Sequence, residues 1–193
     1  MIKTKNDLQY YLKQDAIADN YRGNAPRLIG SWPNTIWKYK VALRKAEYYR
    51  NLEKKNFVSK ILGGIWLLKY TKLGMKLGYT LPLNVAEEGL SLPHYGTIII
   101  NGNTHIGKNC RIMADVCIGS TNGVNKAATI GDNVYIGVGA KIIGEIEIGD
   151  DVCIGANSVV IKSVENGITV AGVPAKKISN TTAKANLCTK LFI

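Results

Sequence analysis

The chain has 193 residues, of which 46% are hydrophobic, and a formal net charge of +11. This length allows one large domain or two small ones. No apolar run approaches the length of a membrane span, and the start of the chain is too polar for a signal peptide, so we expect a soluble, cytoplasmic protein. The four cysteines have neither paired nor metal-ligand spacing, which argues against a disulfide framework and a metal site.

The positive charge is concentrated in the first part of the chain. Residues 1–80 hold sixteen Lys or Arg against five Asp or Glu, whereas residues 81–193 hold nine of each, so net charges are +11 and zero. This asymmetry indicates an anionic surface or partner. We do not expect nucleic acid, because no module of stacking aromatic residues accompanies the charge.

Three helices are predicted in this basic part, over residues 6–19, 34–55 and 57–77. Asn6 or Asp7 is placed to cap the first helix. The loop that follows it contains four helix breakers, Gly23, Pro26, Gly30 and Pro33. In the second helix larger side chains recur at helical spacing, namely Trp37, Val41, Arg44, Lys45 and Tyr48.

The third helix combines an apolar run with four lysines, Lys60, Lys69, Lys72 and Lys76. We favour a helix packed on the end of the following domain or against a neighbouring subunit, since packing explains most apolar stripes. The alternative is a peripheral contact with an anionic membrane surface or a lipid-linked glycan.

A six-residue repeat dominates the rest of the chain. An aliphatic residue occupies every sixth position, at Ile100, Ile106, Ile112, Ile118, Val124, Ile130, Ile136, Ile142, Ile148, Ile154 and Val160. Glycine follows six of them, at Gly107, Gly119, Gly131, Gly137, Gly149 and Gly155. This period predicts a solenoid of short strands and turns, in which we expect the glycines to adopt turn conformations closed to other residues.

The repeat sets the predicted domains: a basic α-helical region over 1–78, a repeat domain over 79–178 and a polar, loosely ordered tail over 179–193. We expect an irregular first coil over 78–93 and a loop over 120–128. With eighteen residues in each coil, three outward columns are predicted. One is apolar, Ile99, Cys117, Tyr135 and Cys153, and we expect it to face a neighbouring subunit. The others are His105, Gly123, Lys141 and Val159, and Arg111, Thr129, Glu147 and Glu165.

Three segments resemble the hexapeptide-repeat acyltransferases: Ile130–Gly137 (IGDNVYIG), Gly139–Ile142 (GAKI) and Ala171–Lys176 (AGVPAK). The resemblance covers residues 79–178 and is closest to the serine acetyltransferase branch. It implies a mainly β fold, a left-handed parallel β-helix following an N-terminal α-helical region. It also implies a homotrimer with acetyl-CoA bound between neighbouring subunits.

Histidine is the side chain best suited to remove a hydroxyl proton near neutral pH, and the chain has only two. The segment Leu92–Ile99 resembles the family segment with the catalytic histidine, which implies that His94 is the general base. The alternative is a structural histidine that closes the first coil. We expect His105 to be a surface residue, and Cys110 to point inward, which argues against a covalent cysteine route.

The resemblance also implies the residues that bind acetyl-CoA. A backbone N–H at Gly119 or Ser120 is a candidate oxyanion donor. The groove residues are Gly119, Ser120, Val138, Ala156, Ala171 and Gly172, and Lys176 and Lys177 are placed to meet the phosphates. Alternatively, Gly172 and Pro174 simply end the coil.

The chain departs from serine acetyltransferases where they hold the amino acid. Pro93 replaces an aspartate before the histidine, and Lys126 and Ala127 replace an Arg-His pair. We therefore predict a sugar hydroxyl as acceptor, in capsule or surface polysaccharide synthesis. The alternatives are L-serine O-acetylation in cysteine biosynthesis and a non-catalytic β-helix scaffold. Four candidates for the partner of His94 stay open, Asn84, Glu87, Glu88 and Asp115.

Overall fold

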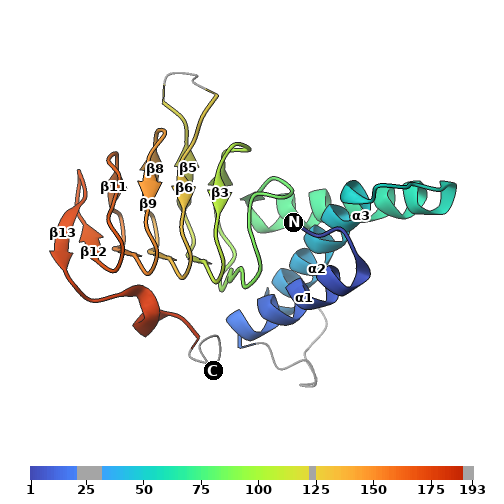
Figure 1. Ribbon diagram of the computed structural model, residues 1–193, viewed down its shortest axis with the longest axis horizontal. Helices are drawn as coiled ribbons and strands as arrows, with labels where there is room; N and C mark the ends of the chain where they lie inside the picture. The colour runs from blue at the N-terminus through green and yellow to red at the C-terminus, as the bar shows by residue number, and fades with distance from the viewer. Residues whose placement is uncertain (21–31, 122–124, 189–193) are drawn as a thin grey trace.

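The computed structural model describes residues 1–20, 32–121 and 125–188 (Figure 1). Three helices come first, α1 (Lys5–Ala18), α2 (Trp32–Asn51) and α3 (Phe57–Leu77). The strands are β1 (Tyr79–Thr80), β2 (Ile98–Ile100), β3 (His105–Ile106), β4 (Arg111–Ile112), β5 (Val116–Gly119), β6 (Thr129–Ile130), β7 (Tyr135–Ile136), β8 (Lys141–Ile143), β9 (Glu147–Ile148), β10 (Cys153–Ile154), β11 (Val159–Val160), β12 (Thr169–Ala171) and β13 (Lys176–Ser179). A 3₁₀ helix, η1 (Ala183–Asn186), follows them.

The helices form where predicted, and the ends of α1 and α2 differ from the prediction. Thr4, and neither Asn6 nor Asp7, caps α1: its hydroxyl accepts from the Asp7 N–H, and the Asp7 carboxylate accepts from the Thr4 N–H. Helix α2 begins two residues before the predicted start, since Pro33 is tolerated in a first turn. The predicted breakers Gly23, Pro26 and Gly30 lie outside the described residues. Helix α3 has the predicted bounds, from the Asn56 cap to left-handed Gly78. Among the described residues no helix is long and apolar enough to cross a membrane.

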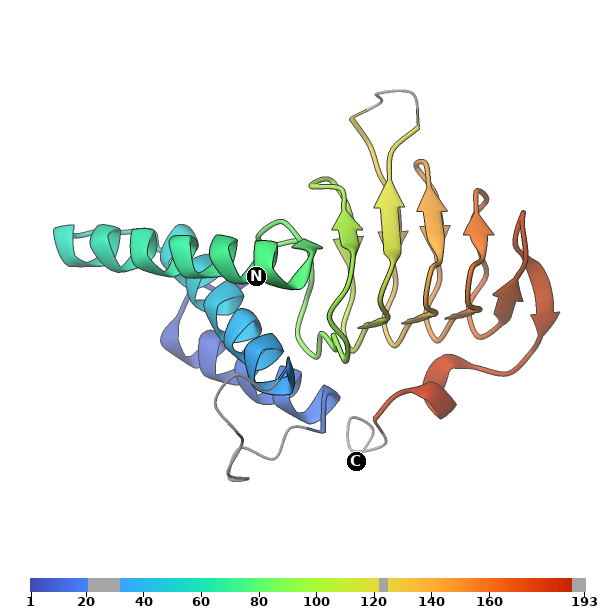
Figure 2. The same cartoon turned by 180° about the vertical axis from the view of Figure 1, so that it is seen from behind.

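The strands form three sheets that the chain visits in rotation. Sheet A has the order β1-β2-β5-β8-β11, sheet B has β3-β6-β9, and sheet C has β13-β12-β10-β7-β4. All neighbouring strands are parallel except β12 and β13. Figures 1 and 2 show the coils stacked in a row with the helices at one end. The predicted irregular first coil is confirmed, because isolated bridges join Ala86 to Ile106 and Ser91 to Arg111.

The core is the stack of repeat aliphatics between the three sheets. Ten of the eleven are at most 2% exposed, and Val124 lies outside the described residues. Each coil covers the aliphatic side chains of the next, so the interior forms only through stacking. The six-residue period therefore predicted the core correctly.

The repeat glycines act differently from the prediction. None of the six that follow the aliphatics has a positive φ; that conformation occurs at other positions, including Asn109, Asp115, Asn133, Asp151 and Asn157. Most of the six glycines instead lie against the backbone of the next coil. At Gly137 an added Cβ would lie 2.7 Å from the Ala156 nitrogen. These glycines are thus required for close approach between coils.

Gly137→Ala is expected to lower the free energy of unfolding by about 1–3 kcal/mol, because two stacked backbones must move apart. Gly64→Ala in α3 is the matched control, since nothing lies within 4 Å of its added Cβ. That control should be neutral or stabilising by up to about 1 kcal/mol. Chemical denaturation measures both, and equal effects would contradict this account.

Residues 120–121 and 125–128 lie outside helices and strands, as the predicted loop requires, and the register changes across this segment. Strand partners are 18 residues apart from Ile99 to Cys117 but 24 apart from Cys117 to Lys141. The predicted columns are therefore wrong, since one hexapeptide length leaves the coil after β5. The outward columns are Ile99, Cys117, Lys141 and Val159 on sheet A; His105, Thr129 and Glu147 on sheet B; and Arg111, Tyr135, Cys153 and Thr169 on sheet C.

The C-terminal segment packs through two residues, Ala183 and Leu187, where a loosely ordered tail was predicted. Ala183 and Leu187 are buried in a cluster with Cys153, and Tyr135 packs against it. The chain thus covers this part of sheet C itself. The predicted contact of Tyr135 and Cys153 with another subunit stays a prediction, and part of this surface is covered by the chain itself.

A buried ion network joins the helices to the first coil. Arg44 on α2 donates to the Asp15 carboxylate of α1, to Glu47 and to the carbonyls of Ala86 and Glu87. Lys40 is also buried and pairs with Asp19. This network holds two cations and three carboxylates, so the N-terminal basic excess lies outside it.

Candidate active site

His94 lies at the corner where the first coil passes from sheet C to sheet A. It falls between Ser91, which bridges to Arg111 in sheet C, and β2 in sheet A. The side chain is exposed, while its backbone carbonyl accepts a hydrogen bond from the buried Tyr79 hydroxyl. Tyr79 in turn packs edge-on against Tyr39, with ring centroids 5.1 Å apart. The sequence thus anchors the His94 backbone and presents its imidazole at the surface.

The corners below His94 form a continuous edge, here called the C–A edge: residues 93–97, 113–115, 137–139, 155–157 and 171–173. Backbone hydrogen bonds connect successive corners. The Gly139 N–H donates to the Ala114 carbonyl at 2.9 Å, and Asn157 donates to Val138 at 2.8 Å. At about 4.8 Å between strands, four steps separate the first corner from the last, or about 19 Å.

Small or apolar side chains line this edge. Val138 is 43% exposed, Val173 is 72% exposed, and Ala156 and Gly172 are exposed. Ala171 lies at the end of β12 beside them. Four predicted groove residues, Val138, Ala156, Ala171 and Gly172, therefore share an edge with His94. A long ligand that lay along such an edge could bond to backbone amides and would displace few side chains.

Two lysines follow at the far end of the C–A edge. Lys176 pairs with Ala171 and Lys177 with Val170 in the antiparallel β12–β13 pair, and both lysines are exposed. The edge thus has an imidazole at one end and two ammonium groups at the other. Ammonium groups there can bind phosphates.

Gly119 and Ser120 lie elsewhere. Gly119 ends β5 and Ser120 follows it, where the chain leaves sheet A toward sheet B, whereas His94 precedes β2 of sheet A. Within one chain, the predicted oxyanion donors thus lie at one end of the sheet A strands and His94 lies at the other. Sequence spacing alone did not reveal this, because it depends on the rotation through the sheets.

Three of the four possible partners of His94 lie at other corners. Asn84 donates to Asn51, Glu88 pairs with Lys108 at 3.5 Å, and Glu87 accepts from the Tyr11 hydroxyl and the N-terminal ammonium. Burial would raise the pKa of Glu87, but those two donors outweigh it and hold the pKa below its usual value. Asp115 alone of the four belongs to the C–A edge, where it is exposed with a φ of 61°.

Cys110 is fully buried, as predicted, and burial raises the pKa of its thiol well above the usual range. The thiolate needed for covalent catalysis is thus disfavoured. Across the described part of the chain, no group of three or more His, Cys, Asp or Glu residues is arranged to hold a metal ion.

A polar cavity of about 530 Å³ lies beside the loop that follows β5. Lys126 and Ala127 line it, the two residues that replace the Arg-His pair of serine acetyltransferases. Lys126 forms an ion pair with Glu145 at 2.6 Å. The sequence predicted the loop, but the cavity could be found only from the structure.

The fold and the six-residue repeats resemble those of hexapeptide-repeat transferases. Residues 127–162 match the family model "Bacterial transferase hexapeptide (six repeats)". Serine acetyltransferases are among its homologues. The serine acetyltransferase of Buchnera aphidicola subsp. Acyrthosiphon pisum (strain APS) is 40% identical over 106 residues, which are 53% of this chain and 39% of that protein. The chain thus matches about two fifths of this curated relative.

Solved serine acetyltransferases have the same fold. The enzyme of Brucella abortus strain S19 has a TM-score of 0.67 at 26% identity, covering 92% of this chain and 71% of that one. Its complex with coenzyme A gives 0.65 at 24% identity, over 92% and 70%. The Neisseria gonorrhoeae enzyme in complex with serine gives 0.64 at 27% identity, over 91% and 70%.

These relatives overturn the predicted acceptor. The departures from the serine acetyltransferase pattern at Pro93, Lys126 and Ala127 predicted a sugar hydroxyl as acceptor. The relatives found are named serine acetyltransferases, and one was solved with serine. The prediction of a sugar acceptor was therefore wrong, and serine O-acetylation, its stated alternative, is better supported.

Proposed function

We propose that this protein is an acetyl-CoA-dependent serine O-acetyltransferase with His94 as general base. The observation that carries the proposal is the C–A edge, with His94 at one end, small apolar residues along it, and Lys176 and Lys177 at the other end. The Brucella relative solved with coenzyme A and the Neisseria relative solved with serine support the donor and the acceptor.

The reaction needs one base and no covalent enzyme intermediate. His94 takes the proton of the serine hydroxyl as the oxygen attacks the thioester carbon of acetyl-CoA. The carbon–sulfur bond then breaks, and the imidazolium returns the proton to the departing thiolate. The products are O-acetylserine and coenzyme A. Asp115 is the proposed partner that orients or stabilises the imidazolium.

The donor would lie along the C–A edge. The pantetheine arm follows Val138, Ala156, Ala171 and Gly172, with its thioester toward His94. The nucleotide end then reaches Lys176 and Lys177, whose positive charges meet its phosphates. Coenzyme A is a long molecule with a reactive end and an anionic end, which suits an edge of about 19 Å.

The complete site is proposed to need a second chain. On the outer face of sheet A, Ile99 is 45% exposed, and Cys117 and Val159 are partly exposed on either side of Lys141; Ile161, which directly follows β11, is 50% exposed. We propose that sheet A, in a left-handed β-helix closed into a triangular prism, forms the contact of a cyclic homotrimer. This contact would bring His94 of one chain near the partner subunit's Gly119 and Ser120, which supply the oxyanion donors.

The cavity beside Lys126 is the proposed acceptor pocket. Asn103, Asn125 and Glu147 line it together with Lys126 and Glu145. Serine carries both a carboxylate and an ammonium group, and this cavity offers both charges. We propose that residues 79–178 carry out this chemistry and that residues 1–78 make other contacts.

The purified protein is expected to release coenzyme A from acetyl-CoA when L-serine is added, followed with a thiol reagent and by mass detection of O-acetylserine. D-serine and L-alanine are the matched controls, one with reversed stereochemistry and one without the hydroxyl. Acetyl-CoA binding without release in the presence of L-serine would contradict the activity. Absence of both binding and release would favour the non-catalytic scaffold.

A further inference from the structure

Helix α3 carries an apolar stripe with no partner in the described chain. The stripe consists of Phe57, Ile61, Ile65, Leu68 and Met75, which are 77%, 48%, 42%, 63% and 72% exposed. Their spacing places them along one side of the helix. The packed side includes Leu77, which is buried, and Tyr70 and Leu73, which pack against the core. Helix α3 is therefore apolar on two opposite sides, of which only one is covered.

The position of α3 leaves the stripe accessible. Figure 2 shows the helix projecting away from the stacked strands, with the end that begins at Phe57 furthest from them. The covered side meets α2, where Gly63 allows a close approach: an added Cβ there would lie 3.2 Å from the Tyr49 Cβ. The stripe thus lies on an outer part of the molecule.

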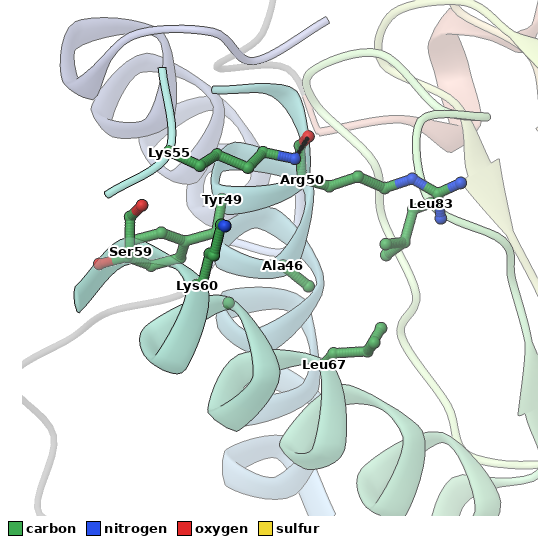
Figure 3. A pocket seen from close by; sticks show the side chains of 9 residues that line it. Ala46, Tyr49, Arg50, Lys55, Ser59, Lys60, Leu67 and Leu83 are labelled. Atoms are coloured by element: carbon green, nitrogen blue, oxygen red, sulfur yellow. Dashed lines mark hydrogen bonds between the residues drawn. The ribbon is translucent and has the colours of Figure 1, made fainter. Parts of the chain in front are cut away.

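The stripe is bordered by positive charge on both sides. On one side, a cavity of about 370 Å³ between α2 and α3 is lined by Arg50, Lys55 and Lys60 (Figure 3). On the other, a cavity of about 610 Å³ is lined by Lys38, Lys69 and Lys72 together with Trp37 and Trp66. No acidic residue lines either cavity, and α3 itself contains none.

This charge distinguishes between two possible occupants. A second copy that met this helix with its own α3 would place four lysines from each α3 along one contact, and like charges at close range repel. An anionic lipid surface instead offers hydrocarbon to the stripe and negative headgroups to the lysines. Trp66 lies on the side of α3 that faces α2 and is not part of the stripe. Trp66 already has the Lys45 and Lys69 ammonium groups 4.0 and 4.5 Å from its ring centroid.

We propose that α3 is a peripheral membrane-binding element that inserts the stripe between the headgroups of an anionic bilayer. This interaction is independent of the acetyltransferase activity proposed above. It explains two features that the proposed catalytic site does not use: the exposed stripe, and the fact that every charged residue of α3 is positive.

The test is flotation of the full-length protein with vesicles of phosphatidylcholine alone or mixed with phosphatidylglycerol. Wild-type protein should float only with the mixed vesicles, and added salt should weaken the binding. The double variant Ile61→Gln, Leu68→Gln should reduce binding by about tenfold or more. Tyr10→Gln on α1, where Tyr10 is 50% exposed, is the control for loss of an exposed apolar group and should bind as wild type.

A second set of variants tests the charges. Replacing Lys60, Lys72 and Lys76 by glutamine should abolish the preference for phosphatidylglycerol. Replacing the exposed Lys3, Lys5 and Lys13 makes the same change in net charge and should leave most of the binding intact. Circular dichroism and sedimentation verify the fold and mass of each variant. Failure of the wild type to float, equal losses in the controls, or a lower oligomeric mass in the stripe variant would overturn the proposal.

Discussion

Replacing His94 by alanine is expected to reduce turnover by about 10²–10⁴-fold, the usual contribution of a positioned general base. The effect should fall on kcat, because the proton is transferred in the transition state. Binding of acetyl-CoA should be nearly unchanged, since the other residues of the C–A edge, the proposed donor site, stay in place. Steady-state kinetics with L-serine and titration of coenzyme A measure the two effects separately.

His105→Ala is the matched control for this prediction. His105 is exposed on sheet B, away from the C–A edge, and its loss should leave turnover near that of the wild type. Because the His94 side chain is exposed, both variants should keep the wild-type Tm. Substantial turnover in a folded His94→Ala protein would exclude His94 as the base.

Replacing Arg44 by leucine is expected to lower the free energy of unfolding by about 3–5 kcal/mol. Arg44 is fully buried, and burial alone would lower its pKa, but the Asp15 and Glu47 carboxylates outweigh this and raise it. The substitution leaves both carboxylates buried without their cation and removes donors to two carbonyls of the first coil. Tm should fall by roughly 6–20 °C in thermal denaturation.

Arg50→Leu makes the same change at an exposed position of the same helix and should shift Tm little. A comparable decrease in both variants would show that the network adds nothing specific. Catalytic activity of Arg44→Leu below its unfolding transition should persist, because the network touches the opposite side of the first coil from His94.

The sequence predicted well what depends on local pattern. The six-residue period identified the buried aliphatics and the strands, and helical spacing placed the three helices to within a few residues, apart from the last four predicted for α2. It also placed His94 one repeat before the regular coils. These features depend on the direction in which each side chain points from the backbone, and the local helix or strand period determines that direction.

Features that depend on how coils stack could not be predicted. The predicted outward columns were wrong because the segment after β5 adds six residues between stacked strands. The six-residue period continues through it without a break, but each later residue lies on a different sheet from the one predicted. Packing of Ala183 and Leu187 on Cys153 was missed because the tail is polar overall. The grouping of His94 with Val138, and its separation from Ser120, required knowledge of the order of the sheets.

The loop after β5 has one further implication. The strands on either side of it, β5 and β6, belong to the same coil, because they pair with β2 and β3 of the preceding coil. The length of the loop therefore does not affect how the coils stack. Segments of different length and composition can therefore be inserted there without altering the interior. The shape of the pocket beside Lys126 can change in this way, and substrate preference can diverge on an unchanged scaffold.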